Sequence, residues 1–167
     1  MGLLRLAIHR RPSEVTRGDS LSDETSVDGL VVLQERTVNL VNQLNMPLVE
    51  VSLVVAKHLG RLMETLEQHL QDTGQTVSER IASPWPLDME SVASSSSFSL
   101  DKVMDIVDHQ RMDILETLIR VTLIEIDVTV VDAVLALRAW EHLVRSQLAR
   151  ATGPGQLFSP VEIPDDW

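Results

Sequence analysis

The sequence predicts an α+β, mainly helical fold: an N-terminal helical pair, a linker, and then a helix–β-hairpin–helix unit. Apolar residues recur every three or four positions over 28–73, as on one face of a helix. Apolar residues, most of them β-branched, alternate with polar ones over 119–131, as in a half-buried strand. We therefore expect five segments: a disordered or loosely ordered N-terminus 1–27, a helical region 28–73, a Ser/Pro-containing linker 74–99, the helix–hairpin–helix 100–150, and an acidic-apolar tail 151–167.

Composition narrows the class of protein. The 167 residues are 44% hydrophobic and 23% charged, as in a folded chain. The net charge of −11 repels phosphate, so we expect no nucleic-acid partner. The absence of cysteine excludes disulfides and thiol catalysis and suits a cytoplasmic protein. No run approaches the roughly 18 apolar residues of a membrane helix, so we expect no transmembrane segment.

The N-terminal half predicts two helices. Asp28 can cap a helix from about Gly29 to Asn45, and Pro47 suits the first turn of the next helix. That second helix runs to about Asp72. Its apolar residues form a seam along one face: Leu48, Val51, Val55, Leu59, Leu62, Leu66 and Leu70. The seam either packs on the rest of this chain or pairs with a second copy.

The linker and the tail each allow two interpretations. Prolines flank Trp85, and a serine run follows at 94–97, which favours a linker. Trp85 either anchors on a groove of a partner or covers part of this protein's own core. The tail 151–167 either docks on a partner or is a loose end.

The last third carries the strand signal. A short helix over 100–113 precedes IRVTLIEIDVTVV, in which β-branched residues dominate. The alternation changes phase after Ile124-Glu125, which a two-residue hairpin turn there would explain. A helix over 136–150 then follows. The alternative is a long buried helix through the same region.

The predicted hairpin has one apolar and one polar face. The apolar assembly face would contain Ile119, Val121, Leu123, Ile126, Val128 and Val130. The polar face would contain Arg120, Thr122, Asp127 and Thr129. An isolated hairpin is marginal in water, so the apolar face would need a partner.

The stretch 119–127 resembles V-R-V-S-L-V-G-I-E of the gas vesicle A/J/M/S family, which contains the shell protein and its minor relatives. Without a gap, Asp132-Ala133 falls on the family's E-A and Trp140-Glu141 on its V-E. The resemblance covers residues of about 100–150, with Glu125 in place of the turn glycine. It implies hairpins that join edge to edge into ribs, with apolar faces lining a gas-filled lumen. The partners would be further copies and other gas vesicle proteins.

No pattern indicates an enzyme. No two histidines lie three or four positions apart on one helix face, so we expect no metal site. Acidic residues around His109, and Glu141 beside His142, suit a solvated helix face better than acid–base chemistry. We expect no catalytic residues, cofactor or small-molecule substrate, since no phosphate loop or nucleophile motif occurs.

Two functions remain as expectations. The first is a minor or accessory structural protein of gas vesicle assembly, located in the cytoplasm and associated with the vesicle, that self-associates through the hairpin. The second is a helical adaptor or oligomeric scaffold that binds protein partners through an amphipathic helix and the C-terminal tail.

Overall fold

The computed structural model describes residues 19–88 and 99–167, with side chains described from residue 27 onwards. Predictions for the first 18 residues and for the serine run 94–97 lie outside the described residues. The elements are α1 (Asp19–Gln43), α2 (Leu48–Thr73), α3 (Glu79–Ala82), α4 (Leu100–Ile106), α5 (His109–Glu125), α6 (Val130–Ala149) and the 3₁₀ helix η1 (Pro154–Phe158). The described part contains no strand, only an isolated bridge between Pro47 and Pro160.

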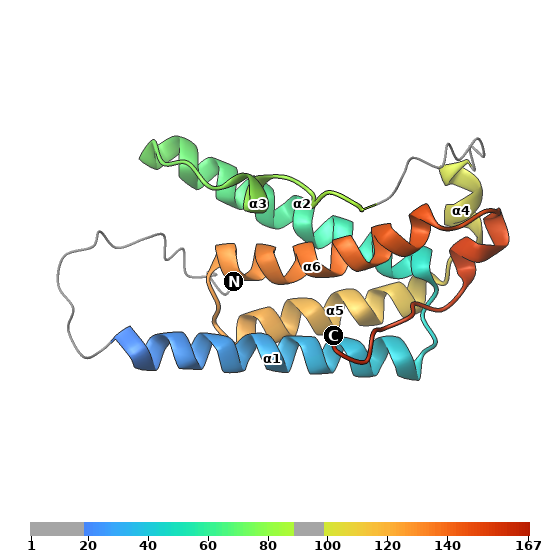
Figure 1. Ribbon diagram of the computed structural model, residues 1–167, viewed down its shortest axis with the longest axis horizontal. Helices are drawn as coiled ribbons and strands as arrows, with labels where there is room; N and C mark the ends of the chain where they lie inside the picture. Colours follow the sequence, from blue (N-terminus) through green and yellow to red (C-terminus); the bar gives the residue numbers. More distant parts are fainter. Residues whose placement is uncertain (1–18, 89–98) are drawn as a thin grey trace.

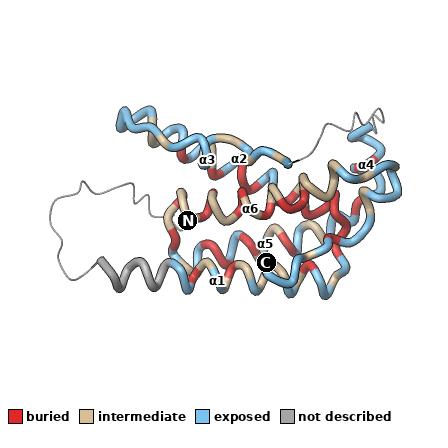
Figure 2. The backbone as a smooth tube through the Cα atoms, viewed as in Figure 1, coloured by how far each residue is buried: buried red, intermediate tan, exposed pale blue. Residues whose placement is uncertain are grey.

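The four long helices form a bundle (Figure 1). Helix α1 lies antiparallel beside α5, and α2 packs most extensively on α6, which runs in the opposite direction. After α2, the segment that contains α3 lies along α6. Segments 28–73 and 100–150 therefore share one core, and their buried positions line the facing sides of the helices (Figure 2).

Turn residues separate α1 from α2 as the sequence indicates. Asn45 has a φ of +44°, and Pro47 precedes the first residue of α2. Gly74, with a φ of +67°, ends α2 in the left-handed conformation that glycine adopts without a steric penalty. Helix α1 begins at Asp19, well before the expected start at Gly29. The seam of α2 lies in the core of this chain, with Leu70 half-buried at its end.

The predicted β-hairpin is wrong. Residues 119–125 are the second half of α5, which the side chain of Asp108 caps by accepting from the backbone N–H of Arg111 at 3.0 Å. The chain turns after α5 at Asp127, whose φ is +48°. The hydroxyl of Thr129 then caps α6 by accepting from the backbone N–H of Asp132 at 3.1 Å.

Burial explains why the alternation was misleading. Ile119, Thr122 and Leu123 share the buried face of a helix with a period of 3.6, whereas Val121 is 47% exposed. The change of phase marks the end of one helix and the start of the next. Burial of α5 between its neighbours outweighs the low helix propensity of its β-branched residues.

The two predicted hairpin faces are therefore scattered. From the apolar face, Ile119, Leu123, Val128 and Val130 are buried, Ile126 is half-buried and Val121 is exposed. From the polar face, Thr122 is buried, Arg120 and Asp127 are exposed, and Thr129 is a helix cap. Neither the residues of the predicted apolar face nor those of the predicted polar face lie together on one face of a helix.

Helix α1 lies close to the α5–α6 turn at Gly29. A Cβ atom built on Gly29 would lie 3.0 Å from the Cβ of Ile126. A larger residue at this position would require Ile126 or α1 to shift by a few tenths of an ångström. Among the described residues, no helix is both long and apolar enough to span a bilayer.

Candidate protein-binding surface

Helix α5 is fixed at its N-terminal end by a buried ion pair. The carboxylate of Glu50, on α2, is 1% exposed and accepts from Nε and Nη2 of Arg111, each at 2.6 Å. The same carboxylate accepts from the backbone N–H of Asp108 at 2.9 Å. Hydrogen bonding to Glu50 raises the pKa of Arg111. A bidentate pair of this kind sets both position and rotation of the helix.

The middle of α5 is fixed to α2 by a cluster around Glu116. Its carboxylate accepts from Lys57 at 2.7 Å and from Arg61 at 2.9 Å, and these hydrogen bonds lower the pKa of Glu116. The backbone oxygen of Glu116 lies 3.2 Å from Nε2 of the buried His58. A proton on Nε2 lets the ring donate a hydrogen bond to this oxygen. Burial lowers the pKa of His58.

The C-terminal end of α5 is tied to α1. The guanidinium of Arg36 donates to both carboxylate oxygens of Glu125, at 2.6 and 3.1 Å, and to the hydroxyl of Thr122 at 3.4 Å. Hydrogen bonding to Arg36 lowers the pKa of Glu125. Because the pair is exposed, its main effect is on orientation.

These anchors leave one face of α5 exposed to solvent. We call it the outer face, formed by Gln110, Asp113, Ile114, Thr117, Arg120, Val121 and Ile124, all exposed. Its apolar members, Ile114, Val121 and Ile124, are 44, 47 and 49% exposed. Other large exposed apolar side chains lie on α1, at Val27 and Val31, and on the seven-residue α4.

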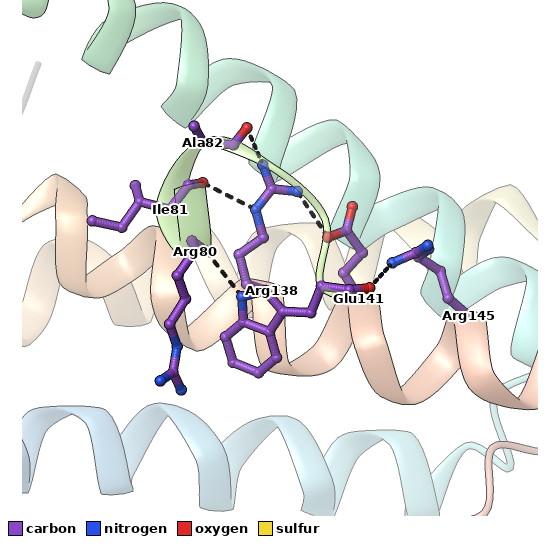
Figure 3. Close-up of polar contacts among 7 residues, drawn as sticks. Arg80, Ile81, Ala82, Arg138, Glu141 and Arg145 are labelled. Carbon is purple, nitrogen blue, oxygen red and sulfur yellow. Dashed lines mark hydrogen bonds and ion pairs between the residues drawn. The ribbon is translucent and has the colours of Figure 1, made fainter. Parts of the chain in front are cut away.

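Helix α6 holds the segment 79–86, which we call the strap (Figure 3). The buried Arg138 donates to the carbonyl oxygens of Ile81 and Ala82, both at 3.2 Å, and to Glu141 at 2.8 Å. One and two turns further along α6, His142 contacts the carbonyl of Pro86 at 3.2 Å and Arg145 donates to that of Trp85 at 2.8 Å. Arg138, His142 and Arg145 therefore all contact backbone carbonyl oxygens of the strap.

Trp85 lies within this strap. Its Nε1 donates to the carbonyl of Arg80 at 2.9 Å, and the guanidinium of Arg80 stacks 4.9 Å from the centre of the indole ring. The flanking prolines keep the chain extended. Trp85 therefore covers part of this protein rather than standing free.

The tail is docked on the same helix. The side-chain amide of Gln147 donates to the carbonyl of Glu162 at 2.6 Å and accepts from its N–H at 3.0 Å. Trp167 packs edge-on against the buried Trp140, with ring centroids 5.5 Å apart. Strap and tail thus engage α6 within the chain, while the outer face of α5 has no such cover among the described residues.

His109 and His142 contact backbone oxygens. Nε2 of His109 lies 3.0 Å from the carbonyl of Met104, and His142 contacts the strap. Within the described residues, no group of three or more His, Asp or Glu side chains is arranged to hold a metal ion. The seam of α2 is occupied by α6 and does not form a surface.

Sequence reasoning missed the outer face as a unit. It named Val121 and Arg120 but assigned them to opposite faces of a hairpin. The available signal was the spacing of Ile114 and Val121, which lie seven residues apart and so on one side of a helix.

Comparisons with protein-family models, with curated proteins and with solved structures find no match for this chain.

Acidification is expected to destabilise the fold through His58. Since the pKa of His58 is lowered in the folded state, the unfolded chain binds this proton more tightly. The contribution to stability is complete above the ordinary pKa of 6.5 and is lost as the pH falls below it. Urea denaturation from about pH 8 to about pH 5.5 should show a flatter pH dependence for His58→Gln than for the parent. Parallel curves over this range would contradict the assignment.

Replacing Arg138 by alanine is expected to release the strap. The variant loses both hydrogen bonds to the strap carbonyls, so trypsin should cleave after Arg80 about tenfold faster. Mass spectrometry of the early fragments gives this rate, with Arg150→Ala, exposed at the end of α6, as the control. Equal cleavage after Arg80 in the two variants would show that Arg138 does not hold the strap.

Proposed function

We propose that this chain is a helical adaptor that binds protein through the outer face of α5. The supporting observation is the group of Ile114, Val121 and Ile124, each nearly half exposed on one face of a helix. Single exposed apolar residues are common, but several on one face of a rigid helix are typical of an interaction site. A helix presenting such a face suits a groove or another helix as its partner.

The anchors of α5 favour this assignment. Contacts of Arg111, Glu116 and Glu125 hold the helix on its other sides, so the outer face is presented in one orientation. A pre-oriented face loses less conformational entropy on binding. The adaptor we expected from the sequence used the α2 seam and the tail, both of which are engaged within the chain.

The proposed role does not use a β-hairpin. The expected part in gas vesicle assembly required edge-to-edge pairing of strands, and the residues concerned are helical. We propose a cytoplasmic location, which the absence of cysteine supports.

Site-specific photo-crosslinking in cells that produce the chain tests the proposal. Benzoylphenylalanine at Val121 is expected to give a protein adduct of discrete mass, which Ile114→Glu should abolish. The same group at Glu67, exposed on α2, is the matched control and should give none. Absence of an adduct at 121, or equal adducts at both positions, would contradict binding through the outer face.

A further inference from the structure

We propose that the outer face of α5 binds the same face of a second copy of this chain, in an antiparallel pair about a two-fold axis beside Thr117. This inference rests on the proposed function, because it names the partner of the same surface. It follows from the order of charges and apolar groups on that face.

The outer face has two edges. Seven residues make about two helical turns, so Asp113 and Arg120 lie in line along one edge. Ile114 and Val121 lie in line along the other edge by the same spacing. Thr117, a small residue, lies between the two pairs. One edge is therefore charged and the other apolar.

A two-fold axis between the copies, perpendicular to α5, reverses the helix but keeps like edges together. Asp113 of each copy then lies at the level of Arg120 of the other copy, which forms two equivalent ion pairs. On the opposite edge, Ile114 of each copy meets Val121 of the other. Thr117 meets its own equivalent at the axis, where a small side chain permits close approach.

The charges also select the direction of pairing. A parallel pair has its two-fold axis along the helices, which sets the charged edge of each copy against the apolar edge of the other and leaves Asp113 and Arg120 without opposite charges. Within the part of the chain that the structure describes, neither side chain makes an ion pair or a hydrogen bond. At roughly 10 Å apart along the helix, they cannot pair with each other in one copy.

The expected dimer is weak. Helix α5 has 17 residues and is therefore about 25 Å long, so a single helix pair is a small interface. We expect a dissociation constant on the order of 10 µM. Association would then respond to the local concentration of the chain.

Charge exchange in the full chain tests the pairing by sedimentation equilibrium. Asp113→Arg alone and Arg120→Asp alone are each expected to weaken the dimer about tenfold, because each places like charges at two contacts. The double variant, with both substitutions, restores opposite charges and should return to within about threefold of the parent. Circular dichroism checks that each variant folds, and both positions are exposed.

Two outcomes would overturn the inference. One is a double variant as weak as the single variants, and the other is a parent chain that stays monomeric to about 200 µM. The crosslinking at Val121 separates this failure from failure of the proposed function. An adduct with a different protein, from a chain that is monomeric, would retain the adaptor and exclude self-pairing.

Discussion

Replacing Arg111 by alanine is expected to lower the free energy of unfolding by about 3–5 kcal/mol. The substitution removes two hydrogen bonds of 2.6 Å and leaves the carboxylate of Glu50, 1% exposed, with only the backbone N–H of Asp108. A buried charge without its counter-ion is costly. Chemical denaturation at neutral pH measures the loss.

Two variants provide the controls for this ion pair. Glu50→Gln keeps an acceptor for the N–H of Asp108 and removes the buried charge, so it should cost less than Arg111→Ala. Lys57→Ala removes an exposed partner of Glu116 and should stay within about 1 kcal/mol of the parent. If Arg111→Ala and Lys57→Ala cost the same, the buried pair does not hold α5 in place.

Aspartate at Val128 and at Val121 is expected to have very different effects. Val128 is 2% exposed in the turn before α6, so Val128→Asp buries a charge and should cost about 3 kcal/mol or more. Val121 is 47% exposed, so Val121→Asp should change stability by less than about 1 kcal/mol. Thermal and urea unfolding of the two variants measure the difference.

This comparison also separates the helical structure from a hairpin. In a hairpin that turns at Ile124-Glu125, the two valines would face each other across the strands, and the two substitutions would have similar effects. Equal losses of stability would contradict the helix–turn–helix described above. Val121→Asp should nevertheless weaken binding through the outer face.

The sequence predicted correctly those features that are determined within a single helix or turn. The apolar seam of α2 and the turn at Pro47 follow directly from residue spacing, because period and proline geometry act within the element. The stop at Gly74 follows in the same way. The start of α1 was placed too late, since its polar first turns resemble a linker in composition.

The region 119–131 could not be settled from local pattern. β-Branched residues favour a strand by propensity, yet Ile119 and Leu123 are buried by helices that lie far away in the sequence. The turn at Asp127 contains no glycine, so its left-handed residue gave a weak signal. A short stretch of sequence does not contain the distant residues that bury these side chains.

The candidate site was predictable only in part. The spacing of Ile114 and Val121 was present in the sequence, but their exposure depends on which sides of α5 meet α1 and α2. The anchors Glu50 and Arg111 lie 61 residues apart, and no spacing rule connects them. The docking of Trp85 and the tail on α6 likewise depends on the assembled bundle.

Self-pairing of α5 is most directly tested by one introduced cysteine. The chain has no cysteine of its own, so Thr117→Cys gives a single thiol beside the proposed two-fold axis. Mild oxidation should convert most of this variant to a disulfide-linked dimer, while Glu67→Cys, exposed on α2, should remain largely monomeric. Non-reducing electrophoresis measures the fraction of each variant that is a disulfide-linked dimer. Equal and slow dimerisation of the two variants would contradict pairing through the outer face of α5.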